Sequence, residues 1–366
     1  MSDVRLIGFS SRAPLEDALA WIDAHTATLP AELVALAGAA GRVLATPVMS
    51  PVDWPGADCA ATDGYAVQAA ETEGASEYNP LPVQRHALIA AGQPMPAGTD
   101  AVLPFASAQP GGPLLEVLAP TARGAGVDRR GNGVRMGGMM AVGAVRPQTL
   151  ALLMALGADP VAVVRRPVVA LVVAGPKSGP DLLTPMLEAL VARDGGIAEA
   201  MPLPAAGADL ILMAGRTGAG PDDDMPLVLA NAGGMLDMHG IAVRPGDSAG
   251  LGRIGGVPTL LLPGAPHACL AIYDLLAARA VRRMAGRQPL EPYPSMERVL
   301  ERKVVSTVGF TDVIQVNITR THAIPLGTAD ASTLATLVQA DGFMVVPETS
   351  EGFPPGASVR VHIYGV

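Results

Sequence analysis

Residues 166–287 alternate between continuous apolar runs and segments whose apolar residues recur at helical spacing. The runs are typical of strands buried on both faces of a sheet, and they are VVALVVA (168–174), ADLILMAG (208–215) and VPTLLL (257–262). Helical spacing follows each run and predicts helices over 182–193, about 225–232 and 268–285. This repeated order predicts a doubly wound α/β domain, with parallel strands and helices on both faces.

The chain on either side of this domain has different patterns. Leu15, Leu19 and Ile22 share one face of a predicted helix that follows Pro14. A second helical patch is expected from Ala31 to Leu44, broken at Gly38 and Gly41. A short apolar helix is predicted over 149–157, and it could pack on the N-terminal helices. Short runs between prolines and glycines predict a β-rich region, and alternating residues near the C-terminus predict a small β domain. The predicted division is a discontinuous helical domain (1–50 and 136–165), an inserted β-rich domain (51–135), the α/β domain (166–290) and a C-terminal β domain (291–366).

Composition narrows the class of protein. The 366 residues carry a formal charge of −9, which argues against a nucleic-acid-coating protein, since such proteins usually present a basic face. An apolar run long enough to span a membrane is missing, and the N-terminus lacks the layout of a secretion signal. Cys59 and Cys269 lie too far apart in the sequence for a CxxC metal site, so a reducing, cytoplasmic setting is expected. Lys177 and Lys303 are the only lysines, so arginine supplies almost all positive charge.

The loop after the second predicted strand carries the strongest chemical signal. Its sequence, Gly215-Arg216-Thr217-Gly218-Ala219-Gly220-Pro221-Asp222-Asp223-Asp224, is rich in small residues. Small residues allow backbone amides to approach a phosphate, and the carboxylates that follow suit a divalent cation. An ordinary glycine-rich turn before an acidic helix start is the alternative interpretation.

A second loop follows the third predicted strand. Pro263-Gly264-Ala265-Pro266 opens the predicted long helix, where an anion could bind, although a simple proline-set turn explains the same residues. His267 follows this loop directly and is the histidine most worth attention, because the other histidines are scattered without metal-ligand spacing. Both loops leave the carboxyl ends of parallel strands, where open α/β sheets bind ligands.

Two other motifs do not fit their usual structural context. Gly250–Gly255 matches GxGxxG, but it precedes a strand instead of following one. Lys177 and Ser178 lack the glycine spacing of a P-loop.

Several motifs, in this order over nearly the whole chain, resemble those of the MoeA/gephyrin E-domain family of molybdopterin molybdenumtransferases. The most specific one is Asp63-Gly64-Tyr65-Ala66-Val67, which resembles the family's MDGYAV signature. The others are Leu15–Ala18 with Gly41–Ala45, Gly98–Val102, Arg129–Gly131, Pro185–Gly195, Gly215–Asp223, Arg244–Gly246 and Pro263–Pro266.

The resemblance implies a function in molybdenum cofactor biosynthesis. Members of the family insert molybdate into adenylylated molybdopterin with the help of Mg²⁺ and release AMP. It also implies an elongated homodimer whose active site lies between the α/β domain of one subunit and the inserted domain of the other. An adenylyltransferase or a molybdoenzyme is a possible further partner, whereas no nucleic acid or membrane is expected.

The resemblance assigns roles to particular residues. Asp63 of the partner subunit and Asp223 are the candidate catalytic residues, and Asp222 and Asp223 are the candidate Mg²⁺ ligands. Candidate binding residues for the pterin or a phosphate are Gly215, Arg216, Thr217, Gly218, Gly220, Asp222, Arg244, Pro245, Gly246, Pro263 and Gly264.

Several family residues are missing from the motifs. The acidic pair of the family's RRGED motif is replaced by Asn132 and Gly133, and the asparagine of its PGNP motif is Ala265. The two lysines of KPGKP become Arg244 and Asp247. These losses leave two hypotheses: a divergent transferase, or a non-catalytic protein that binds and delivers molybdopterin or the finished cofactor.

Overall fold

The continuous apolar runs form the centre of a six-stranded sheet in the computed structural model, which describes residues 4–175, 179–290 and 292–365. The strand order is β14 (Ile197–Ala200), β13 (Val168–Val173), β15 (Leu210–Ala214), β19 (Val257–Leu262), β18 (Gly250–Ile254) and β16 (Gly234–His239). The first four strands are parallel, and β18 pairs antiparallel with both β19 and β16. The strands predicted over 168–174, 208–215 and 257–262 are therefore confirmed.

Helices cover both faces of this sheet, as the alternation of the sequence predicts. One face packs on α1 (Leu15–His25), α3 (Leu183–Asp194), α5 (Pro266–Ile272), η4 (Tyr273–Ala277) and α6 (Ala278–Met284). The other face packs on α4 (Met225–Asn231) and on a loop that contains Ala205 and Ala208. Every residue of β15 is buried, because its alternate side chains enter these two separate clusters.

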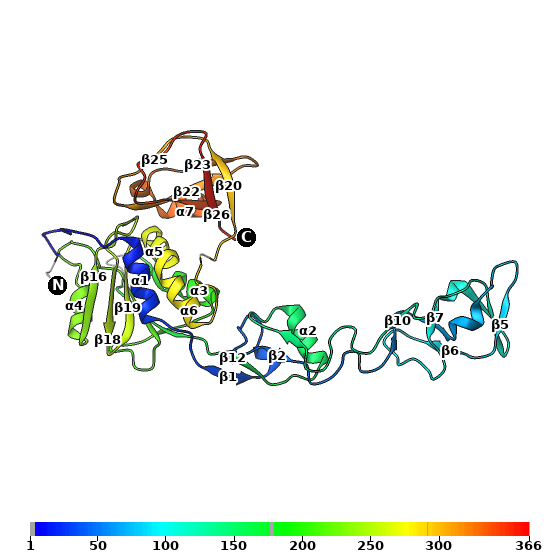
Figure 1. Ribbon diagram of the computed structural model, residues 1–366. Helices are drawn as coiled ribbons and strands as arrows, with labels where there is room; N and C mark the ends of the chain where they lie inside the picture. The colour runs from blue at the N-terminus through cyan, green and yellow to red at the C-terminus, as the bar shows by residue number, and fades with distance from the viewer. Residues whose placement is uncertain (1–3, 176–178, 291, 366) are drawn as a thin grey trace. The chain divides into compact units, whose positions relative to one another are not determined.

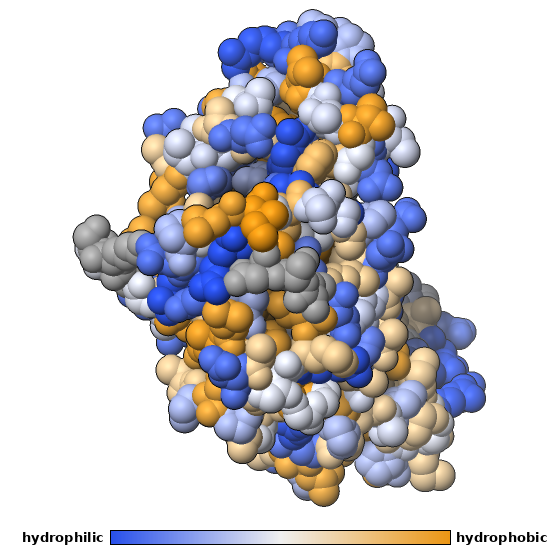
Figure 2. All heavy atoms as spheres, turned by 90° about the vertical axis from the view of Figure 1, so that its left-hand side faces the viewer, coloured by the Kyte–Doolittle hydropathy of each residue, from blue (hydrophilic) through white to orange (hydrophobic). Residues whose placement is uncertain are grey.

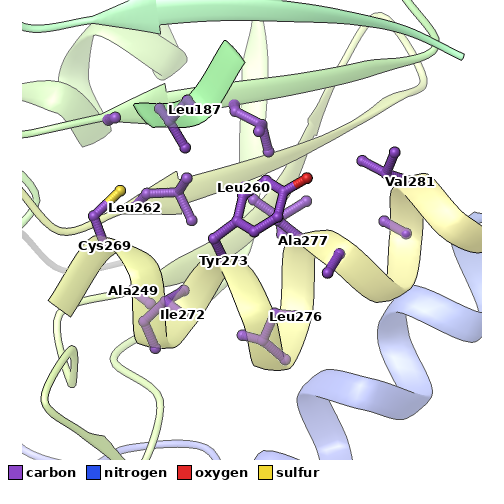
Figure 3. Packing of buried hydrophobic residues seen from close by; sticks show 14 of the residues in the cluster. Leu187, Ala249, Leu260, Leu262, Cys269, Ile272, Tyr273, Leu276, Ala277 and Val281 are labelled. Atoms are coloured by element: carbon purple, nitrogen blue, oxygen red, sulfur yellow. The ribbon is translucent and has the colours of Figure 1, made fainter. Parts of the chain in front are cut away.

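The long helix predicted over 268–285 begins at Pro266 and is interrupted in its middle. Proline is well placed in a first helical turn, where its missing N–H would have no partner in any case. The middle of the helix is the π-helical turn η4. Figure 3 shows its first residue, Tyr273, among Leu187 of α3 and Leu260 of β19.

The GxGxxG match at Gly250–Gly255 is strand β18 and its following turn, so its rejection as a dinucleotide fingerprint is confirmed. A Cβ on Gly252 would lie 2.3 Å from the carbonyl oxygen of Met235, so close strand approach explains that glycine.

A second six-stranded sheet forms the C-terminal part of the same compact unit. Its order is β17 (Val243–Arg244), β22 (Thr311–Ile318), β23 (His322–Pro325), β20 (Ser295–Leu300), β26 (Ser358–Ile363) and β24 (Gly342–Val346). Short elements accompany it: β21 (Val304–Val305), β25 (Gly352–Phe353), η5 (Ala329–Ala331) and α7 (Leu334–Gln339). The alternating pattern of the sequence predicts this small β structure, and the prediction is confirmed.

The chain divides into two compact units, each described here by itself (Figure 1). The first combines the residues up to Glu32 with those from Val164 onward, and the second is Leu33–Val163. The predicted division into four domains remains a prediction. Between Ala31 and Val164 the elements are β1 (Ala31–Val34), η1 (Leu36–Gly38), β2 (Val48–Met49), β3 (Cys59–Ala60), β4 (Gly64–Val67), η2 (Ala69–Thr72), β5 (Leu81–Val83), β6 (His86–Ile89), β7 (Ala101–Leu103), η3 (Phe105–Ser107), β8 (Ala108–Gly111), β9 (Leu114–Val117), β10 (Val127–Asp128), β11 (Met139–Ala141), α2 (Pro147–Ala155) and β12 (Val161–Val164).

The prediction of a helical patch from Ala31 to Leu44, broken at Gly38 and Gly41, is wrong in its helical part. Ala31–Val34 is the extended strand β1, and only the single 3₁₀ turn of Leu36–Gly38 is helical. Gly41 has φ +70°, a left-handed conformation that cannot continue a right-handed helix. Among the described residues, no helix is long and apolar enough to cross a membrane.

Candidate functional site

Four loops of the first unit surround a cavity of about 440 Å³ at the carboxyl ends of β15 and β19. Nine of the predicted site residues line it: Arg216, Thr217, Gly218, Asp223, Arg244, Pro245, Gly246, Pro263 and Gly264. The residues that complete the lining are Asp247, Ser248, Ala265, His267, Ala268, Ala329 and Asp330. The predicted meeting of the two loops is therefore present, and a segment of the C-terminal part joins them.

Three predicted residues of the first unit are not on this wall. Gly220 and Asp222 belong to the same loop but lie outside the lining, and Gly215 lies directly behind it. The Gly215 amide donates to the carbonyl of Leu262 at 2.9 Å, and a Cβ on Gly264 would lie 3.3 Å from the Gly215 Cα. Both glycines therefore permit the two loops to approach each other closely.

Asp63 belongs to the second unit. Its carboxylate accepts a hydrogen bond from the Ala91 amide at 2.8 Å. The following residue, Gly64, begins β4, and a Cβ there would lie 2.3 Å from the Leu103 carbonyl oxygen. Lys177 and Ser178 lie outside the described residues.

The Asp223 side chain forms a hydrogen bond within its own loop. Its Oδ2 accepts a hydrogen bond from the Gly220 amide at 2.7 Å, and a Cβ on Gly218 would lie 2.7 Å from the same oxygen. One of the amides predicted to bind phosphate thus already donates to a carboxylate. Within the described residues, no three acidic, histidine or cysteine side chains gather as metal ligands.

Arg216 has an unusual backbone conformation for a residue with a side chain. Its φ is +53°, in the left-handed region that favours glycine. Its guanidinium lies 3.3 Å from Asp224, and both side chains are about two-fifths exposed. A strained, charged residue on the wall of a cavity is typical of a functional site.

Thr217 joins the glycine-rich loop to two other segments. Its buried hydroxyl lies 3.0 Å from the hydroxyl of Ser248, and its carbonyl accepts from His239 Nε2 at 2.9 Å. Sequence reasoning did not identify Ser248 as a site residue. Only its place directly after the Arg244–Asp247 motif could have indicated it.

Arg244 is held by carboxylates of the C-terminal part. It donates two hydrogen bonds to Asp312, at 2.9 and 2.8 Å, and a weaker one to Asp330 at 3.3 Å. Burial opposes the charge of Arg244, but the bonds and charge of Asp312 outweigh this effect, so the pKa of Arg244 is raised. Asp312 is 2 % exposed, and Ser306 also donates to it. A phosphate at Arg244 would therefore compete with a two-pronged, buried ion pair.

The N-terminal segment fastens the loops of the cavity from outside. The Leu6 amide donates to the Ala219 carbonyl at 2.8 Å, and the Phe9 ring contacts the His239 ring edge-on at 4.9 Å. Arg12 forms an ion pair with Asp247 at 2.5 Å.

On the face that carries α4 and β16, small hydrophobic and hydrophilic areas alternate (Figure 2).

These features define a class of protein: an α/β ligand-binding domain with its cavity at the strand ends, followed by a β domain. Residues 188–283 match the model of a probable molybdopterin binding domain. Residues 13–157 match the model of the MoeA N-terminal region (domain I and II), and residues 297–364 match that of the MoeA C-terminal region (domain IV). The chain belongs to the MoeA/gephyrin E-domain family, as the sequence motifs predict.

Individual relatives agree with this assignment. The chain is 28% identical to "Molybdopterin molybdenumtransferase 2" of Mycobacterium tuberculosis, covering 90% of this chain and 94% of that one. It is 23% identical to "Molybdopterin molybdenumtransferase" of Staphylococcus aureus, over 95% and 94% of the two chains. Two crystal structures of the molybdopterin biosynthesis MoeA protein of Pyrococcus horikoshii have the same fold. One has a TM-score of 0.78 at 23% identity, covering 97% of this chain and 100% of that one. The other has a TM-score of 0.77 at 26% identity, covering 96% and 99%.

Proposed function

We propose that this chain is a molybdopterin molybdenumtransferase-like protein of molybdenum cofactor biosynthesis, which inserts molybdate into adenylylated molybdopterin. The cavity at the ends of β15 and β19 carries the proposal, because small residues and arginines line it in a chain that matches MoeA at both ends. Such a lining suits a phosphorylated ligand, since backbone amides and guanidinium groups both bind phosphate oxygens.

Six residues of the cavity wall have roles in the proposed binding of the pterin. The amides around Thr217 and Gly218 bind the phosphate of the pterin, and Arg216 pairs with its charge. Arg244, Pro245 and Gly246 form the opposite wall, where Arg244 holds the C-terminal β structure beside the substrate.

The donor set suits Mg²⁺, which commonly binds through one or two carboxylates together with substrate phosphates and water. Asp223 lines the cavity and Asp222 precedes it, so these two residues would hold the ion. The ion would neutralise charge on the transferring phosphate groups. Asp223 has a second task in holding the Gly220 amide, which keeps the loop in shape.

We further propose a homodimer in which Asp63 of a partner subunit helps to position molybdate or the metal. The second unit exposes apolar side chains that a second copy could cover. Met49 and Met139 are cross-strand partners on β2 and β11, and they are 51% and 62% exposed. Exposed apolar side chains that lie together are common in protein–protein interfaces. An adenylyltransferase that supplies the substrate, or a molybdoenzyme that receives the cofactor, remains a possible further partner.

A non-catalytic carrier of molybdopterin is the less favoured alternative. The carrier hypothesis is based on missing side chains. The family motifs have polar or acidic residues at the positions of Asn132, Gly133 and Ala265. The retained Asp63 and Asp223, and the relatives named as transferases, favour the enzyme.

AMP release separates the two functions. The full-length chain is incubated with adenylylated molybdopterin, Mg²⁺ and molybdate, and AMP is measured by chromatography. We expect release that falls about 10²–10³-fold in Asp223→Ala, because a charged group at the reacting centre contributes on that order. Glu188→Ala, an exposed change on α3, serves as the matched control and should leave the rate unchanged. Tight pterin binding without AMP release would show a carrier instead.

A further inference from the structure

His267 is a titratable residue of the cavity whose role the family motifs do not explain. It lies in the first turn of α5, directly after the Pro263–Pro266 loop, and it is half-buried. Its side chain lines the cavity together with Arg216, Asp223 and Arg244. It makes no hydrogen bond or ion pair with any residue that the structure describes.

Every other titratable side chain on this wall already has a partner. Asp223 accepts from the Gly220 amide, and Asp247 pairs with Arg12. Asp330 pairs with Arg244, which also holds Asp312, and Arg216 pairs with Asp224. His267 is therefore the side chain on the wall that can accept a proton without first giving up such a partner.

Other histidines of the chain show what a structural role looks like. His25 Nδ1 lies 2.8 Å from the Trp21 carbonyl oxygen, and His239 Nε2 donates to the Thr217 carbonyl. His322 Nδ1 lies 2.8 Å from the Thr321 hydroxyl. Each of these contacts anchors the ring, whereas His267 has no such anchor within the described chain.

The protonation state of His267 suits a base. Burial lowers the pKa of His267, so the imidazole is neutral near pH 7 and keeps a free lone pair. The charged groups that face it across the cavity are Arg216, Asp223, Arg244, Asp247 and Asp330. The three carboxylates favour protonation and the two arginines oppose it, and each of these charges is partly neutralised by its own partner.

We propose that His267 is the general base of the AMP-releasing step, accepting the proton of the water that cleaves the phosphoanhydride bond of adenylylated molybdopterin. This proposal rests on the proposed function. An oxygen–phosphorus bond to water forms, and the bridging oxygen–phosphorus bond breaks. AMP leaves as a phosphate monoester, and the water proton passes to the imidazole and then to solvent. No electrons are transferred, so no further reactant is needed.

The test compares His267→Ala and His267→Gln with the unchanged chain. We expect AMP release to fall about 10²–10³-fold in both variants, within the range typical of a lost general base, while pterin binding changes less than about twofold. Wild-type kcat/KM should fall as pH drops below the lowered pKa of His267, and this limb of the profile should vanish in the variants. Added imidazole should restore part of the activity of His267→Ala. His322→Ala, a change on β23, is the control and should behave as wild type.

Opposite results would overturn the assignment in distinguishable ways. AMP release that rises as pH falls would show that the imidazolium acts as a phosphate-binding cation. Unchanged rate and pH profile in both variants, beside active wild type, would remove His267 from the reaction and leave the proposed function intact. Absence of AMP release by the wild-type chain would end both proposals. Thermal unfolding of both variants, with the polar and similarly sized His267→Gln as the milder change, excludes misfolding as the cause of lost activity.

Discussion

Two groups of charged side chains lie along the helix formed by α5, η4 and α6, and they differ in how much water reaches them. At its start, His267 shares the open cavity with Arg216 and with Asp330, whose side chains are 42% and 70% exposed. Around its π-helical turn, Asp274 and Asp194 are only 6% and 0% exposed. Charged side chains thus stay hydrated where they line the proposed site, and they are buried in ion pairs where they stabilise the fold.

The buried group is a closed network, which we call the Arg193 cluster: Arg193, Asp194, Asp274, Arg282 and Tyr293. Arg193 lies 2.7 Å from Asp194 and 2.8 Å from Asp274, and Asp274 also accepts from the Tyr293 hydroxyl at 3.0 Å. Burial opposes the charge of Arg193, but the two carboxylates outweigh it, so the pKa of Arg193 is raised. Tyr293 connects the Arg193 cluster to the C-terminal β sheet, because its ring packs edge-on against Phe343 of β24.

The largest expected effect is on stability, from Asp274→Ala. Without this carboxylate, the buried positive charge of Arg193 is paired with Asp194 alone. Breaking a buried ion pair typically costs about 3–5 kcal/mol. We expect the free energy of unfolding at pH 7 to drop by about 3 kcal/mol, measured by denaturant titration. Glu188→Ala on the exposed side of α3 should change it by less than about 0.5 kcal/mol. An equal, small effect of both changes would mean that the Arg193 cluster does not differ from surface charge.

The second prediction concerns pH. Burial raises the pKa of Asp274 to about 6, against the pull of Arg193. An acid with a raised pKa in the folded state stabilises the fold fully below its unfolded pKa, and this contribution is lost as pH rises through about 6.

Wild-type stability should therefore fall between pH 4 and 7 by about 2 kcal/mol relative to Asp274→Asn, which cannot titrate. If the free energy of unfolding depends on pH in the same way for both proteins across this range, the prediction is wrong. The charged groups of the cavity should contribute little to the difference, since water screens them.

The smallest expected effect has the opposite sign. Glycine at position 216 would accept φ +53° without strain, so Arg216→Gly should stabilise the fold, by up to about 1 kcal/mol. The same change removes the guanidinium from the cavity wall and should weaken pterin binding about tenfold. Calorimetry and thermal unfolding on one preparation test both parts. A loss of stability would contradict the prediction and mean that Arg216, like the Arg193 cluster, stabilises the fold.

The sequence alone was enough to predict the parts of the fold that depend on local pattern. Continuous apolar runs bounded by glycine predicted β13, β15 and β19, since a strand buried on both faces tolerates few polar residues. The two loops at the strand ends followed from that topology. The helical patch expected from Ala31 to Leu44 does not form as an α-helix, even between the breaks expected at Gly38 and Gly41. Ala31–Val34 is extended and Leu36–Gly38 is a single 3₁₀ turn, which apolar spacing alone does not reveal.

The pairings within the site were beyond the sequence. Arg244 meets Asp312 from 68 positions away, and Thr217 meets Ser248 across two different loops. Nothing in the spacing of these residues indicates which arginine is held by a buried carboxylate and which by an exposed one. The position of His267 after the Pro263–Pro266 loop is visible in the sequence, whereas its lack of a hydrogen-bond partner among the described residues is visible only in the structure.

The contacts of the N-terminal segment have a practical consequence for preparing the protein. Leu6, Phe9 and Arg12 each touch a residue that shapes a loop of the cavity, and they precede the region matched by the MoeA N-terminal model. A shortened clone that starts at the matched region would lose all three contacts while keeping every family motif. Assays of the cavity therefore need the segment that holds Leu6, Phe9 and Arg12.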